Sequence, residues 1–86
     1  MWIGPEQHQI VGRHLAKLRQ DANVTQVELA RRLSKPQSFV SSYERGQRRV
    51  DFLEFAHIIR ALSGDIQKAG AELLNIVAPL VMQAKD

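Results

Sequence analysis

The sequence predicts an all-α fold of five helices in a chain of 86 residues. Apolar residues recur at spacings of three and four in five separate stretches, which is the period of an α-helix. Residues that cap or stop helices lie between these stretches. No stretch shows the alternation and turn residues of a β-hairpin. A chain of this length suffices for one compact domain, so we expect a single domain over residues 1–86.

The first helix is expected to begin after Pro5 and to run to about Asp21. Asn23 then provides a stop, because asparagine tolerates the left-handed conformation that ends many helices. Four apolar residues share one face of this helix: Val11, Leu15, Leu18 and Ala22.

The second helix follows at once. Thr25 is a favourable N-cap, and Glu28 three residues later completes a predicted capping box. Val27 is expected to be partly covered, and the pair Ser34–Lys35 to break the helix. The buried face consists of Leu29, Ala30 and Leu33.

The third helix is expected to start with Pro36, whose fixed φ suits the first helical position, and to end at Gly46. One face is apolar and carries Phe39, Val40 and Tyr43. The rest of the helix is polar and carries Gln37, Ser38, Ser41 and Ser42.

The fourth helix has Asp51 as its predicted N-cap, with Glu54 three residues later, and Gly64 as its predicted end. Five apolar residues follow the helical period: Phe52, Phe55, Ile58, Ile59 and Leu62.

The fifth helix is expected to begin after Asp65. Pro79 lies inside its pattern, and we expect the helix to kink or end near Val77 because proline lacks the backbone N–H. One apolar stripe contains Ile66, Ala69, Leu73, Ile76 and Leu80. A second, adjacent stripe contains Gly70, Leu74, Val77 and Val81.

Positive charge is concentrated around the second and third helices. Residues 31–49 contain six basic residues and one acidic residue, a net charge of +5, whereas the rest of the chain carries −2 and the whole chain +3. A localised basic patch is typical of proteins that bind a polyanion. On charge alone, a solvated basic face is an equally good interpretation. The connection of about three residues sets the two helices at a steep angle, as in a helix-turn-helix.

The segment from Leu15 to Leu62 resembles the helix-turn-helix of the phage lambda repressor and Cro group, also called the xenobiotic-response-element type. The matching stretches are TQVELARRL, SKPQSFVSSYERG and DFLEFAHIIRAL. The resemblance implies a five-helix lambda-repressor-like DNA-binding domain, with its core motif at about residues 15–62 and a C-terminal helix at about 65–83. Ser34 departs from the pattern, because it stands where this family often carries glycine.

The resemblance implies that the third helix lies in the DNA major groove with its first residues at the base edges. These residues are Gln37 and Ser38, with Ser42 one turn further along. Glutamine can bind adenine through two hydrogen bonds, and serine is a less specific donor and acceptor. Ser41 lies on a neighbouring face and is expected to reach either a base or a phosphate. For Phe39, contact with a thymine methyl and simple packing both stay open.

The resemblance also implies that Gln26, the first residue of the second helix, binds a phosphate and braces Gln37. A phosphate suits a helix N-terminus, where backbone N–H groups are free. Four further residues are candidate phosphate contacts, with Arg49 and Arg45 favoured over Arg48: Lys35, Arg45, Arg48 and Arg49.

Arg19 and Glu44 are expected to form a structural ion pair, again as the resemblance implies. Glu44 stands at the end of the third helix, and Arg19 ends the apolar face of the first. Removing one partner of a buried pair strands the other charge, so replacing Glu44 is expected to loosen the domain and not to change base preference.

Nothing in the sequence indicates an enzyme. The three histidines, His8, His14 and His57, lack metal-ligand spacing and are expected at the surface. No nucleophile motif or phosphate-binding glycine loop is present, so we expect no catalytic residue, no metal and no cofactor. The absence of cysteine fits the cytoplasm. No apolar run approaches the roughly 18–20 residues of a membrane span, and no signal peptide is recognisable.

These features favour a sequence-specific transcriptional regulator, in the first place a repressor, of a bacterium or phage. The second stripe of the last helix predicts a homodimer on a palindromic operator in double-stranded DNA. Trp2 stays open as a further cover for that surface. One alternative is an antitoxin or a restriction–modification controller, in which a toxin or another protein would bind the stripe. The other is a protein-interaction adaptor that has lost DNA binding, against which Gln37 and the arginines argue.

Overall fold

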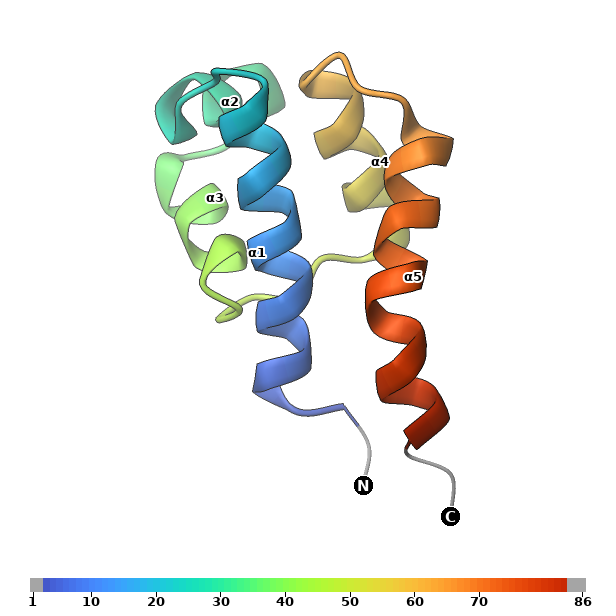
Figure 1. Cartoon of the computed structure of the whole chain (residues 1–86). Coiled ribbons are helices and arrows are strands. Elements are labelled where there is room, and N and C mark those ends of the chain that lie inside the picture. Colours follow the sequence, from blue (N-terminus) through green and yellow to red (C-terminus); the bar gives the residue numbers. More distant parts are fainter. Residues whose placement is uncertain (1–2, 84–86) are drawn as a thin grey trace.

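The computed structural model describes residues 3–83, so Trp2 lies outside the described part. This part of the chain contains five helices and no strand, which confirms the predicted all-α class. The helices are α1 (Pro5–Asp21), α2 (Gln26–Leu33), α3 (Gln37–Glu44), α4 (Phe52–Ala61) and α5 (Ile66–Gln83). Figure 1 shows α1 with α3 on one side and α5 on the other, and α2 packs directly against both α3 and α4.

The two ends of α1 follow from local chemistry. Pro5 occupies the first turn, and the Gln7 side chain accepts a hydrogen bond from the Gly4 amide at 2.8 Å. Asn23 adopts a left-handed conformation with φ 58°, which confirms it as the stop. The Val24 amide then donates to the Arg19 carbonyl at 3.2 Å, which satisfies one of the last free carbonyls of the helix.

Only half of the capping box predicted for α2 is present. The Thr25 hydroxyl accepts a hydrogen bond from the Glu28 amide at 3.0 Å, as expected of an N-cap. The Glu28 carboxylate does not return to Thr25, because it is bonded to Arg31 and Arg32 one turn later. Those two guanidinium groups lower the pKa of Glu28 to about 2. Val27, expected to be partly covered, is 61% exposed.

The turn between α2 and α3 places one residue in an unusual conformation. Ser34 has φ 56° and ψ 42°, in the left-handed region that favours glycine. Pro36 is the N-cap of α3 and not its first helical residue, because the turn requires the extended conformation that Pro36 adopts at ψ 156°. Gly46 ends α3 with φ 78°, and a Cβ there would lie 2.6 Å from the Gln9 Cα.

Helix α4 begins with the predicted capping box, in which the Asp51 and Glu54 side chains each accept the other's backbone N–H. Phe52, expected in the core, is 87% exposed, because it lies at the first helical position, beyond the part of the face that is buried at Phe55, Ile58 and Ile59. The helix ends at Ala61, and the left-handed residue that ends it is Ser63, at φ 59°, and not Gly64.

The prediction that Pro79 kinks or ends α5 near Val77 is wrong in its second part, since α5 continues to Gln83. Pro79 and Asn75 are both exposed. The Asn75 carbonyl, which has no helical N–H partner because residue 79 is proline, is therefore free to bind water, and the helix can continue.

Asp65 starts α5 by accepting a hydrogen bond from the Lys68 amide at 3.0 Å. Among the described residues, no helix combines the length and apolar character needed to cross a membrane.

The core brings α1, α2, α3 and α4 together around one group of apolar side chains. Its largest fully buried members are Tyr43, Leu15, Leu29, Ile58, Ile59 and Val40. Gly12 makes the packing of α1 on α3 possible, because a Cβ at this position would lie 2.1 Å from the Tyr43 carbonyl oxygen. This close approach holds the end of α3 against α1 and directs the opposite, polar face of α3 outward.

Candidate nucleic-acid interface

The outer face of α3 is polar and accessible. Gln37 and Ser38 are exposed, and Ser41 and Ser42 are half-buried. On the inner face, Val40 and Tyr43 are completely buried and fix how the helix is rotated. The four residues predicted to contact bases therefore lie on the side of α3 that a ligand can reach, although the two serines of the second turn are less accessible.

A chain of hydrogen bonds leads from the core to Gln37. The Glu44 carboxylate receives the Arg19 guanidinium through bonds of 2.7 Å from Nε and 3.1 Å from Nη2. Both side chains are about nine-tenths buried, and Arg19 also donates to the Val24 carbonyl at 2.9 Å. The Gln26 Nε2 donates to Glu44 Oε1 at 2.8 Å. The Gln37 Nε2 then donates to Gln26 Oε1 at 3.3 Å.

This relay determines which way each amide faces. An ionised carboxylate only accepts hydrogen bonds, so Gln26 must turn its NH₂ group toward Glu44. The Gln26 Oε1 is then directed at Gln37, so Gln37 must donate an N–H to it. Gln37 consequently keeps its own Oε1 and its second N–H available. An acceptor beside a donor complements the major-groove edge of adenine, which carries N6–H₂ and N7.

The basic residues predicted to contact phosphates differ in how many contacts they make within the protein. Arg45 makes one bond of 3.3 Å to the Gln47 side chain, and the Arg49 guanidinium has no partner among the described residues. Both line a hollow of about 510 Å³ beside the start of α1, together with His8 and Gln9. The ammonium of Lys35 lies 5.5 Å from the centre of the Phe39 ring and forms no ion pair in the described part of the chain.

Arg48 is already occupied by other residues. Its guanidinium forms two hydrogen bonds to the Glu54 carboxylate, at 3.0 and 2.7 Å, and donates to the Arg49 carbonyl at 2.7 Å. It also lies 4.6 Å from the centre of the Phe39 ring, close enough for a cation–π interaction. The Arg48 contact, aided by the Asp51 amide, lowers the pKa of Glu54 to about 2. Arg48 therefore ties the loop before α4 to α3.

Phe39 packs within the protein, with its ring edge-on to Tyr43 at a centroid distance of 5.5 Å. The sequence did not predict the roles of two further residues in this region, Gly12 and Glu54. Gly12 could have been found, because a glycine in the middle of a predicted helix often marks a close approach of two backbones. Glu54 was recognised as a capping residue, but nothing in its spacing indicated that it also binds Arg48.

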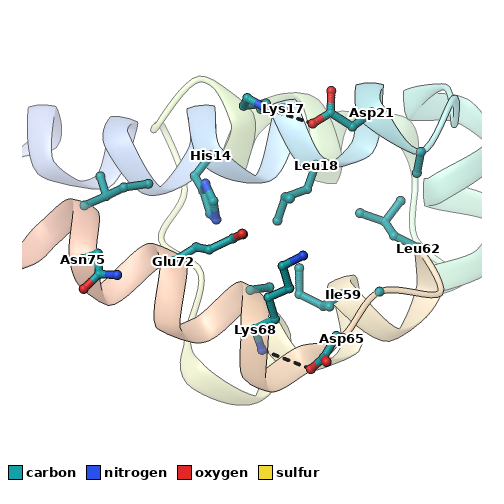
Figure 2. Close-up of a pocket in the computed structure, with 14 residues that line it drawn as sticks. His14, Lys17, Leu18, Asp21, Ile59, Leu62, Asp65, Lys68, Glu72 and Asn75 are labelled. Atoms are coloured by element: carbon teal, nitrogen blue, oxygen red, sulfur yellow. Dashed lines mark hydrogen bonds and ion pairs between the residues drawn. The ribbon is translucent and has the colours of Figure 1, made fainter.

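A second hollow, of about 710 Å³, lies between α1 and α5 and is unsuited to a polyanion. Figure 2 shows His14 of α1 and Glu72 of α5 pointing into the space between these helices. His14 is half-buried, contrary to the expected surface position, and its Nε2 is buried without a hydrogen-bond partner. The charged lining consists of Lys17, Asp21, Asp65, Lys68 and Glu72. Carboxylates outnumber ammonium groups there, so this hollow has no excess positive charge to attract phosphates. Within residues 3–83, no His, Cys, Asp and Glu cluster could hold a metal ion.

The paired short helices, the outward polar face of α3 and the cations beside it define a helix-turn-helix DNA-binding protein. The helix-turn-helix domain family matches residues 10–65. The chain is also similar to the solved structure of an XRE-family like protein from Pseudomonas syringae pv. tomato str. DC3000, with 37% sequence identity and a TM-score of 0.73. The match covers 83% of this chain and 87% of that chain. Comparison with curated proteins finds no match.

The chain belongs to the XRE, or lambda-repressor-like, type of the helix-turn-helix family. The resemblance noted from the sequence is thereby confirmed. Such a domain makes the protein a DNA-binding regulator, and the fold is typical of regulators without catalytic activity.

Proposed function

We propose that the protein is a transcriptional repressor that binds a palindromic operator as a homodimer, with α3 of each protomer in the major groove. The observation that carries this proposal is the relay from Arg19 through Glu44 and Gln26 to Gln37. It prepares the donor and acceptor of one exposed side chain on α3 before any ligand binds, which lowers the entropic cost of base recognition. We further propose that residues 1–86 act as one domain in the cytoplasm.

In this proposal Gln37 reads adenine through a bidentate contact, and Ser38 and Ser42 read neighbouring positions less specifically. Ser41 contacts a base or a phosphate. A good bidentate pair discriminates against the wrong base by about 1–3 kcal/mol. Gln37 therefore supplies the largest single contribution to sequence preference.

Phosphate contacts are assigned to Gln26, Lys35, Arg45 and Arg49. Gln26 stands at the start of α2, where free backbone N–H groups add to the attraction for an anion. Arg45 and Arg49 are exposed, and among the described residues Arg45 has one hydrogen-bond partner and the Arg49 guanidinium has none. Arg48 contributes charge near the same strand, but its bonds to Glu54 make it mainly a support for the loop.

The homodimer is supported by apolar side chains that the single chain leaves uncovered. Leu74, Val81 and Met82 on α5 are 67%, 70% and 72% exposed, and Phe52 and Leu53 at the start of α4 are 87% and 72% exposed. A two-fold dimer would place its recognition helices about 34 Å apart, on successive major grooves. The same α5 face could instead meet a toxin, and a toxin or methyltransferase gene beside this one would favour the antitoxin or controller alternative.

The first test is selection of bound sequences from a random pool of double-stranded DNA at two salt concentrations. We expect a palindrome containing adenine at one position of each half-site, with affinity that falls steeply as salt rises. Recovery of weak binding without sequence preference would contradict reading by α3. It would favour an adaptor that has lost DNA binding, or a missing partner.

Two alanine variants separate the proposed roles on the selected operator. Gln37→Ala should relax the preference at one position of each half-site by about 1–3 kcal/mol and leave the other positions unchanged. Arg49→Ala should weaken binding to all sequences equally. It should also reduce the slope of log affinity against log salt concentration by about one. Equal loss of preference in both variants would contradict the assignment.

A further inference from the structure

A groove of about 510 Å³ lies between α2, α3 and α4, away from the polar face of α3. Its floor is apolar and consists of the half-buried Leu33 and Phe39 and the buried Ile58. Its rim is mostly cationic and includes Arg32, Lys35 and Arg60. His57 and Glu54 complete the polar part of the rim. An apolar floor inside a basic rim is a combination that the proposed DNA contacts do not require.

The free charge of this rim is positive. The Glu54 carboxylate is neutralised by Arg48 at 2.7 Å, and Arg32 is held by Glu28 at 2.9 Å. Arg32 also donates to the Ala61 carbonyl at 2.9 Å, which joins the end of α4 to α2 and makes this side of the groove rigid. Lys35 and Arg60 have no ion-pair partner among the described residues. Two uncompensated cations therefore lie beside an apolar floor.

We propose that this groove binds a short acidic peptide segment of another protein. One large apolar side chain of the segment would pack on Leu33, Phe39 and Ile58. Asp or Glu residues beside it would pair with Lys35 and Arg60. A DNA backbone fits less well, because phosphates gain from the cations but bury no apolar group on the floor. A second copy of α5 fits less well, because its exposed residues Leu74, Val81 and Met82 bring no carboxylate.

Occupation of the groove would compete with DNA. Lys35 precedes Gln37 by two residues and is a proposed phosphate contact, so a carboxylate on Lys35 takes a group that the operator needs. The peptide would thus act as an anti-repressor, a means of regulation for a chain whose described part contains no separate effector domain. This competition rests on the proposed function, whereas docking of the peptide does not.

The test uses the full chain as bait for random peptides displayed on phage, with counter-selection against the Arg60→Glu chain. Arg60 lies on α4 and has no role in the proposed DNA contacts. Arg13→Glu is the matched control, because Arg13 is also exposed but lies on α1 outside the groove. Labelled peptides from the selection are then titrated with the parent and both variants by fluorescence anisotropy.

We expect the selected peptides to combine Asp or Glu with a large apolar residue. Arg60→Glu should weaken their binding about tenfold or more, and Arg13→Glu should leave it unchanged. Methyl NMR signals of Leu33 and Ile58 should shift on addition of peptide while those of Leu74 stay in place, a readout that does not depend on how the variants fold. Added operator DNA should release the peptide.

Three results would overturn the proposal. Peptides without acidic residues, or none at all, would show that the groove does not select this chemistry. Equal peptide affinity for the two variants would place the binding site elsewhere. Loss of operator affinity in Arg60→Glu but not in Arg13→Glu would assign the groove to DNA. Peptide binding that persists in a chain without operator specificity would refute only the proposed function.

Discussion

At the junction of α1, α2 and α3, charged and amide side chains bind one another inside the protein, whereas along the outer face of α5 apolar side chains remain in solvent. Glu44 is nine-tenths buried and receives bonds from both Arg19 and Gln26. Leu74 of α5 is 67% exposed, and Ala69 is the only residue of α5 in the core cluster of the described residues. The first region satisfies its charged and amide groups within one chain, whereas the second leaves apolar side chains uncovered.

This difference separates two kinds of functional surface. A surface that reads bases needs side chains whose donors and acceptors are oriented before the ligand arrives, and the internal bonds of the relay provide this. A surface that buries apolar area against a protein needs no such orientation, because hydrophobic burial is not directional. Substitutions should therefore act on folding in the first region and on association in the second.

The largest expected effect is that of Glu44→Ala, which should lower the free energy of unfolding by about 3–5 kcal/mol because it strands the buried Arg19 charge. The matched control is Glu72→Ala on α5, whose carboxylate is half-buried and has no ion-pair partner among the described residues. It should change stability by no more than about 0.5 kcal/mol. Urea unfolding of both variants measures the difference. Equal midpoints would show that the relay is not a structural element.

The next effect concerns association. Leu74→Glu should leave the stability of the monomer nearly unchanged but should prevent the proposed dimer, because a carboxylate would be buried without a partner. Its affinity for the full palindrome should fall about tenfold or more, while its affinity for a single half-site stays the same. Gln67→Glu adds the same charge at an exposed position of α5 and is the control. Analytical ultracentrifugation measures the oligomeric state, and DNA titration measures the two affinities. If the Leu74→Glu chain still formed a dimer, the interface would have to lie elsewhere, with Phe52 and Leu53 as the next candidates.

The comparison also indicates how far the sequence alone could lead. Helix positions were predictable, because the apolar period and caps such as Thr25 and Asp51 act over a few residues. The exposure of Phe52 was not, because a periodic pattern identifies a face but not where neighbouring helices stop covering it. The continuation of α5 past Pro79 depends on solvent reaching one carbonyl, which no local pattern records.

The candidate site divides in the same way. The family pattern led us to expect roles for Gln26 and Gln37. The orientation of their side-chain amides, however, follows from the Glu44 carboxylate, which is 18 residues away from Gln26 in the sequence. The sequence favoured Arg49 over Arg48 as a phosphate contact, but it did not indicate which residues bind Arg48. Both are neighbouring arginines in one loop, and only the fold brings Glu54 and Phe39 to the first of them.

A smaller effect is expected in the turn that joins α2 to α3. Ser34→Gly should stabilise the protein by about 0.5–1 kcal/mol, because a side chain disfavours the left-handed conformation at φ 56°. Ser41→Gly is the matched control, since the same change inside α3 should cost roughly 0.5–1 kcal/mol through lost backbone entropy. Thermal melting reports both. A destabilising Ser34→Gly would mean that the serine side chain contributes to the turn.

The smallest effect is a dependence on pH that arises from Arg48 and Glu54. The pKa of Glu54 is lowered to about 2, so the unfolded chain, with a pKa near 4.5, binds this proton more readily than the folded one. The stabilisation is therefore complete above about pH 4.5 and is lost as the pH falls toward 2. The Arg48 and Glu54 side chains are 42% and 29% exposed, which limits the pair to less than about 1 kcal/mol.

Urea unfolding of the parent and Arg48→Ala at neutral pH and near pH 3 isolates this contribution, because Glu28 also has a lowered pKa but titrates alike in both proteins. The stability difference between the two proteins should shrink as the pH falls, leaving the part due to Arg48 on Phe39, which does not titrate. A difference that stays constant with pH would mean that Arg48 holds the loop through the ring and the Arg49 carbonyl alone. The loop before α4 would then be held by contacts that do not titrate, and not by an ion pair such as that of the relay beside it.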